Sequence, residues 1–164
     1  MTTDPIAPIK ALSHVAIRCT DLDRSVAFYR DVFGYDVFID NRDQPGGYTV
    51  IGLLGGVAME LVKSNPSPET IERARATDTA RDAGVGHACI AMSVEDIDAT
   101  HARLKAAGLV KTDAPEQVGA VRVIFIRDPD GALLEFIQLG GRNSSLAEIA
   151  GKMRARAAAA AAAP

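Results

Sequence analysis

The stretch Val121-Arg-Val-Ile-Phe-Ile-Arg-Asp-Pro-Asp-Gly-Ala-Leu-Leu-Glu-Phe-Ile-Gln138 predicts two strands joined by a tight turn. Its two halves are rich in β-branched, aromatic and other apolar residues, as is typical of strands. Asp128-Pro-Asp-Gly131 predicts the turn, because proline presets φ, aspartate hydrogen-bonds its own backbone and glycine accepts a positive φ. Glu135 is the exception within the second apolar run. A buried carboxylate must be paired, protonated or bound to metal, so Glu135 marks a candidate site.

A strand, a helix and three strands are predicted before this hairpin. The helix begins at a cap on Thr20 or Asp21 and ends at Gly34, and its apolar stripe holds Leu22, Val26, Tyr29 and Phe33. The predicted strands are residues 12–19, 35–39, 48–53 and 57–62.

The same order then repeats. Residues 86–92 predict a strand, 94–107 a helix stopped by Gly108, and Val110 begins a strand region that leads into the hairpin. The sequence therefore predicts an α+β fold of two repeated βαβββ modules. The predicted organisation is a flexible N-terminus at 1–10, module one at 11–62, a connector at 63–85 that includes a polar helix over 69–83, module two at 86–140, and a C-terminal helix and Ala-rich tail at 141–164.

A constant offset relates the two modules. Gly131 follows Gly56 by 75 residues, and Glu135 follows Glu60 by the same 75. His87 follows His14 by only 73 residues, which predicts a two-residue insertion between strand and helix. The repeat gives Glu135 a counterpart in the first module.

Each module thus carries a histidine on its first strand and a glutamate on its last. Two related open sheets that face one another would bring His14, Glu60, His87 and Glu135 into a shared cavity. Neutral imidazoles and carboxylates suit a divalent ion such as Ni, Co, Zn, Mn or Fe. His101, the third histidine, matches Val26 on the helix stripe and is interpreted as a packed helix residue.

Composition narrows the possible partners. The net charge is −3 and the basic residues are scattered, which argues against a nucleic-acid partner. The sequence has no run of 18 apolar residues, so no membrane span is predicted. The first residues lack the charged-then-apolar pattern of a signal peptide. Two cysteines make no disulfide framework, and Cys19 and Cys89 are predicted to be small buried hydrophobes with free thiols. We expect a cytoplasmic protein.

Residues 11–140 resemble the vicinal oxygen chelate superfamily, which includes glyoxalase I, methylmalonyl-CoA epimerase, extradiol dioxygenases and antibiotic-resistance proteins. The resemblance implies a cup-shaped open β-barrel around a divalent metal, with His14, Glu60, His87 and Glu135 on the ligand positions. The resembling segments are Leu12–Ile17, Asp21–Gly34, Gly86-His87 and Asp128–Glu135.

Glu60 favours a metal-dependent lyase or isomerase of the glyoxalase I type, because glyoxalase I has the set His/Glu/His/Glu. Such an enzyme abstracts a proton beside a metal-bound carbonyl or hydroxyl and converts a 2-oxoaldehyde–thiol adduct into a thioester. Glu135 is the expected base, with Glu60 as ligand or second proton carrier, although the sequence leaves the two roles interchangeable. Arg18 lies on the face of His14. By resemblance it would hold an anionic substrate group, and otherwise it is a strand-end arginine that reaches solvent.

Other readings stay open. Methylmalonyl-CoA epimerases typically have glutamine at the position of Glu60, but the Ser67-Pro-Glu-Thr-Ile-Glu72 run resembles their loop, so an acyl-CoA epimerase is one alternative. An extradiol-type dioxygenase is another. A protein that sequesters a small molecule, as some resistance proteins do, belongs to a different class. In each case the partner is a small molecule, and a homodimer is expected because open sheet edges are usually covered.

Overall fold

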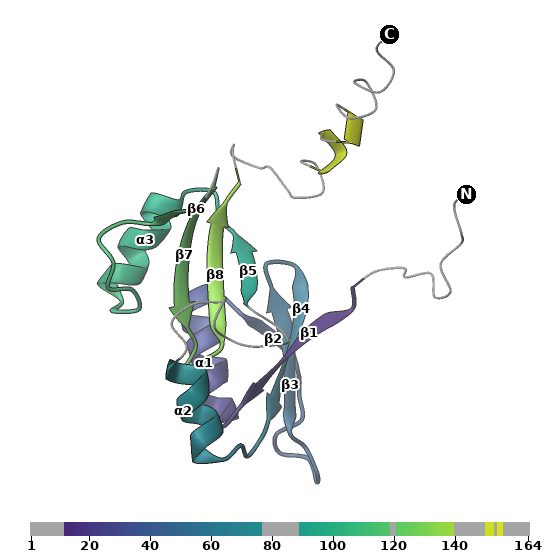
Figure 1. Cartoon of the computed structure of the whole chain (residues 1–164). Coiled ribbons are helices and arrows are strands. Elements are labelled where there is room, and N and C mark those ends of the chain that lie inside the picture. The colour runs from purple at the N-terminus through teal and green to yellow at the C-terminus, as the bar shows by residue number, and fades with distance from the viewer. Residues whose placement is uncertain (1–11, 77–88, 119–120, 140–149, 153, 156–164) are drawn as a thin grey trace, which may run out of the picture. The chain divides into compact units, whose positions relative to one another are not determined.

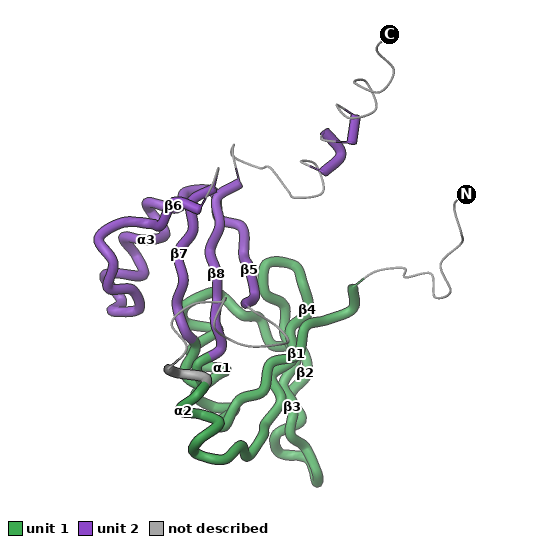
Figure 2. Tube along the Cα trace, viewed as in Figure 1, with its two compact units in different colours: residues 1–76, 128–131 green, residues 77–127, 132–164 purple. Residues whose placement is uncertain are grey.

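The structure is a computed structural model, and it describes residues 12–76, 89–118, 121–139, 150–152 and 154–155. The chain divides into two compact units, shown in different colours in Figure 2. Unit 1 holds residues 1–76 together with 128–131, and unit 2 holds residues 77–127 and 132–164. Each unit is described by itself.

Unit 1 has the predicted order βαβββ, followed by a second helix (Figure 1). Its four strands form one sheet in the order β1-β4-β3-β2, with β1 parallel to β4 and the other neighbours antiparallel. The elements are β1 His14–Cys19, α1 Leu22–Phe33, β2 Asp36–Asp40, β3 Thr49–Leu54, β4 Val57–Lys63 and α2 Pro68–Ala76.

Local signals set the ends of α1. The Asp21 side chain accepts a 3.0 Å hydrogen bond from the Arg24 amide, so Asp21, not Thr20, is the N-cap. Gly34 closes the helix with a φ of 71°, which is the left-handed conformation that glycine adopts at little cost. Leu22, Val26 and Tyr29 are buried as predicted, whereas Phe33 is half-buried.

Unit 2 repeats this plan. Its sheet has the order β5-β8-β7-β6, with β5 parallel to β8. Asp96 caps α3 by accepting a hydrogen bond from the Ala99 amide, and Gly108 follows the helix with a φ of 73°. The elements are β5 Ile90–Ser93, α3 Ile97–Ala106, β6 Glu116–Val118, β7 Val121–Arg127 and β8 Leu133–Gln138.

The hairpin predicted at residues 121–138 is confirmed. Strands β7 and β8 pair antiparallel. Asp128 accepts a 3.0 Å hydrogen bond from the Asp130 amide, and Gly131 has a φ of 97°, as the turn sequence predicts. The prediction that Glu135 is buried is wrong. Leu134 and Phe136 are buried, but Glu135 between them projects from the opposite face of the strand and is only half-buried.

The strand registers correct the predicted repeat. Ala16 pairs with Glu60 in unit 1, and Ala91 pairs with Glu135 in unit 2, so both members are offset by 75 residues. The two N-cap aspartates, at 21 and 96, are also offset by 75. The predicted two-residue insertion between strand and helix is therefore absent, because one offset runs from the strand into the helix.

Several predictions fall on parts of the chain that the structure does not describe. These are the flexible N-terminus at 1–10, the strand start with His87, the end of the connector helix after residue 76, and the alanine run at 157–163. Helical residues are described at 150–152 and 154–155 of the predicted C-terminal helix. Among the helices of the described residues, none combines the length and apolar character needed to cross a membrane.

Candidate metal centre

The first pair of candidate ligands lies in unit 1. His14 begins β1, and Glu60 lies on the neighbouring strand β4 opposite Ala16, two residues further along β1. Side chains two residues apart in a strand share a face, so His14 projects beside Glu60. His14 Nε2 lies 3.6 Å from Glu60 Oε2, and His14 Nδ1 lies 3.2 Å from the Ser13 hydroxyl. An imidazole nitrogen and a carboxylate oxygen on two hydrogen-bonded strands fit a divalent ion.

Both side chains are open to a ligand. The His14 side chain is 46% exposed and that of Glu60 is 21% exposed. A cleft of about 280 Å³ reaches Glu60 and is otherwise lined by Asn41 and residues 44–49. Glu60 therefore borders a space that a small polar molecule can enter.

Arg18 lies on the same face of β1 as His14. Ala16 and Arg18 are exposed like His14, whereas Ile17 and Cys19 are buried. This alternation confirms the predicted shared face. It leaves the role of Arg18 as a prediction.

The second pair lies in unit 2 and differs from the prediction. Glu135 on β8 accepts a hydrogen bond from the Cys89 thiol, with 3.2 Å between Sγ and Oε2. Burial, and after it the hydrogen bond to Glu135 and the charge of that carboxylate, raise the pKa of the Cys89 thiol to about 11. The prediction of a small buried hydrophobe holds for Cys19, which is 1% exposed, and is wrong for Cys89, which is half-buried in a polar contact.

His87, the predicted ligand of module two, lies outside the described residues. Within the described part of the chain, no three His, Cys, Asp or Glu side chains gather closely enough to hold a metal ion. The described donors form one pair in each unit, His14 with Glu60 in unit 1 and Cys89 with Glu135 in unit 2. The sequence contained the signal for Cys89, because this residue stands 75 positions after His14.

His101 is a packed helix residue, as predicted. It is 6% exposed, and its Nε2 lies 3.1 Å from the Thr112 carbonyl oxygen. A carbonyl can only accept, so Nε2 carries the proton in this contact.

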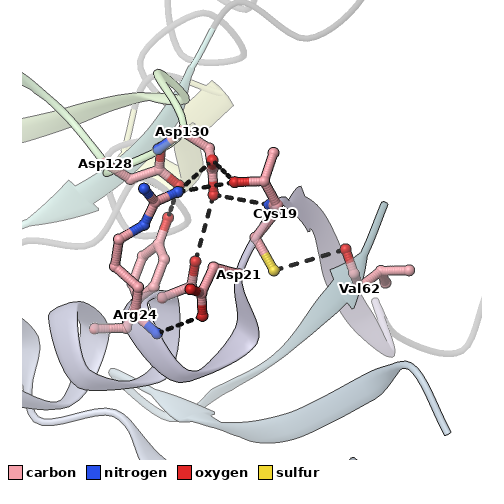
Figure 3. Close-up of polar contacts among 9 residues, drawn as sticks. Cys19, Asp21, Arg24, Val62, Asp128 and Asp130 are labelled. Atoms are coloured by element: carbon pink, nitrogen blue, oxygen red, sulfur yellow. Dashed lines mark hydrogen bonds and ion pairs between the residues drawn. The ribbon is translucent and has the colours of Figure 1, made fainter. Parts of the chain in front are cut away.

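A polar network that the sequence analysis missed surrounds the turn at 128–131 within unit 1. Asp130 accepts hydrogen bonds from the Thr20 amide at 3.0 Å, the Thr20 hydroxyl at 2.5 Å and Arg24 Nη2 at 2.7 Å. Figure 3 shows Arg24 directed toward Asp130. Burial disfavours the charged form of Asp130, but the hydrogen bonds from Thr20 and the Arg24 charge outweigh it and hold the pKa of this carboxyl below its ordinary value.

Tyr29 completes this network. Its hydroxyl donates a 3.0 Å hydrogen bond to Asp128. Burial, followed by the charge of Asp128, raises the pKa of Tyr29. These contacts attach the turn to α1, so the network is structural in character.

Comparison with known proteins gives one answer for the family. The chain is 35% identical over 133 residues to a probable lactoylglutathione lyase of Vibrio cholerae, covering 76% of this chain and 88% of the relative. It is 30% identical over 136 residues to a lactoylglutathione lyase of Haemophilus influenzae, covering 81% and 96%. The fosfomycin resistance protein FosX of Listeria monocytogenes, solved as a mutant complexed with Mn(II), has the same fold, with a TM-score of 0.59, 19% identity and coverage of 86% and 98%. The model of the Glyoxalase/Bleomycin resistance protein/Dioxygenase superfamily matches residues 11–136, and the chain belongs to this superfamily.

Proposed function

We propose that the protein is a metal-dependent lyase or isomerase of the glyoxalase I type. The reaction would convert the adduct of a 2-oxoaldehyde and a thiol into a thioester. The observation that carries the proposal is the contact between His14 and Glu60, which sets an imidazole and a carboxylate side by side at a cleft. The names of the relatives at 30% and 35% identity support the same chemistry.

The proposed ligands are His14, Glu60 and Glu135, with a further donor from the start of the strand paired with β8, where the sequence predicts His87. Members of the glyoxalase family bind divalent metal. These residue types suit Ni, Co, Zn, Mn or Fe. When bound, such an ion would act as a Lewis acid and stabilise the negative charge that develops on a substrate oxygen.

The chain's own carboxylates would move the proton. Glu135 is the proposed base: one of its oxygens takes the proton from the substrate carbon and returns it to the adjacent carbon. Glu60 is the ligand or the second proton carrier. Both glutamates are only partly buried, so their carboxylates are open to a substrate.

Arg18 is proposed to hold an anionic group of the substrate. Its exposed position on the face of His14 supports this role, because a guanidinium there would neutralise a carboxylate near the site.

The test is an assay of methylglyoxal with glutathione after chelation and reloading with each of the five metals. We expect thioester formation with at least one metal, and no turnover with any of them would remove the proposal.

Glu135→Gln should abolish exchange of the substrate proton with deuterated solvent, whereas Glu95→Gln, at an exposed position before α3, should leave it unchanged. Exchange retained by Glu135→Gln would contradict the role of Glu135 as base.

We also propose a homodimer in the cytoplasm. Strand β2 lies at the edge of its sheet and exposes Phe38 and Ile39, which a second copy of the chain would cover. Cys19 and Cys89 are free thiols, which fits a reducing compartment. Light scattering on a Phe38→Asp variant tests the dimer: a mass equal to that of the unaltered protein would argue against this edge.

A further inference from the structure

The cleft beside Glu60 offers neutral polar groups to a ligand. Its polar side chains besides Glu60 are Asn41, Gln44, Tyr48 and Thr49, and all of them come from the segment between β2 and the start of β3. Among the lining residues, each of which the structure describes, Glu60 alone carries a charge. The cleft therefore disfavours an anionic group and suits a neutral one that forms hydrogen bonds.

The arginine of the same segment is engaged elsewhere. Arg42 lies outside the cleft lining and forms ion pairs with Asp40 and with Asp23 on α1. Its charge is matched by these two carboxylates, so the neutral character of the cleft is preserved.

Thr49 lies on the same face of the sheet as Glu60. Ile51 on β3 is the antiparallel partner of Glu60 on β4, and Thr49 stands two residues before Ile51. Facing partners and residues two positions apart project from one face, so the Thr49 side chain projects beside Glu60. Val50 and Leu61, both 0% exposed, project from the opposite face. The Thr49 hydroxyl thus borders a proposed metal ligand.

Asn41 orients the Thr49 hydroxyl. Asn41 Nδ2 donates a 3.4 Å hydrogen bond to Thr49 Oγ1, and the Asn41 amide donates a 3.1 Å bond to the Thr49 carbonyl. Since Thr49 Oγ1 accepts here, its own hydrogen can donate to a ligand, and Asn41 Oδ1 can accept.

Backbone contacts hold the segment in this conformation. The Gln44 amide donates to the Asn41 carbonyl at 3.2 Å, and the Gly47 amide donates to the Gln44 carbonyl at 2.8 Å. A side chain at Gly47 would collide with the Asn41 carbonyl, so the segment packs closely on itself. The donor and the acceptor are therefore set in place before a ligand binds.

The strand order indicates which half of the substrate reaches this cleft. Arg18 on β1 pairs with Val62 on β4, and Val62 pairs on its other side with Thr49 on β3. The proposed function gives the anionic group of the thiol half to Arg18, on the β1 side. The acyl substituent of the 2-oxoaldehyde would then extend to the β3 side, where the cleft lies.

We infer that Asn41 and Thr49 form a subsite for a neutral, hydroxyl-bearing acyl substituent of the substrate. This inference rests on the proposed function and names its substrate class: 2-oxoaldehydes that carry hydroxyl groups where methylglyoxal has its methyl group. A hydroxyl group donates and accepts at once, which matches Asn41 Oδ1 and the Thr49 hydroxyl. A hydrocarbon substituent would leave both groups without the hydrogen bonds that water gives them, and this selects against it.

Two thioethers of glutathione test the subsite without turnover. The dihydroxypropyl and the propyl thioether share the thiol half and the length of the carbon chain, and neither has a carbonyl group that could react. Isothermal titration calorimetry on the full-length protein with zinc would measure each Kd. We expect the dihydroxypropyl compound to bind about tenfold more tightly, because it gains neutral hydrogen bonds. Equal affinities, tighter binding of the propyl compound, or no binding of either would overturn the inference.

Matched variants identify the residues. Thr49→Val keeps the β-branched shape and removes the hydroxyl, and Asn41→Ala removes the amide group. Each should lose most of the preference for the dihydroxypropyl compound and keep the Kd of the propyl compound, which also reports that the variant is folded. Thr70→Val, at an exposed position on α2, should keep the preference. A Thr49→Val protein with the full preference would contradict the assignment.

These outcomes are separate from those of the proposed function. The expected preference without thioester formation under any metal would support the subsite and remove the reaction. Thioester formation from methylglyoxal, together with equal affinities for the two thioethers, would support the reaction and remove the subsite.

Discussion

The Tyr29 hydroxyl donates a 3.0 Å hydrogen bond to Asp128, and both side chains are buried, at 0% and 5% exposure. The contact joins helix α1 to the turn that precedes β8. The two residues are 99 positions apart in sequence, so the bond closes a long stretch of chain within unit 1. A buried carboxylate requires such donors, which makes this bond a stability determinant of unit 1.

Tyr29→Phe should lower the free energy of unfolding by about 2 kcal/mol, because it removes a hydrogen bond to a buried carboxylate. Urea denaturation measures this change. Tyr48→Phe is the control, since Tyr48 is 57% exposed, and it should change stability little. Equal losses in the two variants would show that the Tyr29 hydroxyl contributes nothing specific.

The network around Asp130 predicts a dependence of stability on pH. The folded-state pKa of Asp130 lies below the ordinary value of 3.8. Its contribution is therefore fully present above pH 3.8 and is lost as the pH falls through the lower, folded-state pKa. The stability difference between the unaltered protein and Asp130→Asn should shrink from pH 6 toward acid in urea titrations. Asp43→Asn, at an exposed loop position, should show no such trend, and a constant difference for Asp130→Asn would contradict the prediction.

Local chemistry made most elements predictable from sequence. Asp21 and Gly34 define the ends of α1 through contacts with residues a few positions away. Asp128 and Gly131 shape their turn in the same way. Contacts of this kind depend on neighbours in the chain, so the pattern of residue types is sufficient to predict them.

Register and long-range contacts were not predictable in this way. The sequence predicts His87 as the counterpart of His14 from its residue type, at an offset of 73, although the rest of the repeat has an offset of 75. The parallel pairings of β1 with β4 and of β5 with β8 show that residue 89 is the equivalent position. The apolar strand around Glu135 predicts that this side chain is buried. Strand alternation instead places Glu135 on the other face of β8 from the buried Leu134 and Phe136. Thr20 and Asp130 are 110 residues apart, and no local pattern connects them.

Removal of the metal should destabilise the protein, because an ion that binds only the folded state adds to its stability. At a free metal concentration of 100 times the Kd, the gain is about 2.7 kcal/mol. A chelator should therefore lower the Tm, and His14→Ala should reduce this metal-dependent shift. Glu95→Gln should retain the shift. A Tm that is indifferent to metal in the unaltered protein would argue against a folded-state metal site.

His101→Leu should separate a structural histidine from a ligand. The substitution removes the donor to the Thr112 carbonyl, and we expect a loss of about 1 kcal/mol in unfolding free energy. Bound cobalt should remain stoichiometric, because His101 belongs to the packed stripe of α3. Loss of cobalt in a folded variant would show that the histidine has a role at the metal.

Arg18→Ala should raise the KM for the glutathione adduct by roughly tenfold or more, since a hydrogen bond between charged groups is worth about 1.5 kcal/mol or above. The kcat should change little, because Arg18 is proposed to bind a remote anionic group and not the reacting carbon. Stability should also be unchanged, as the side chain is exposed. Arg18→Lys should recover part of the affinity by keeping the charge while losing the planar fork. Arg30→Ala, which removes an exposed arginine paired with Asp31 at the end of α1, is the matched control. If Arg18→Ala and Arg30→Ala had the same KM, Arg18 would be a strand-end residue that reaches solvent.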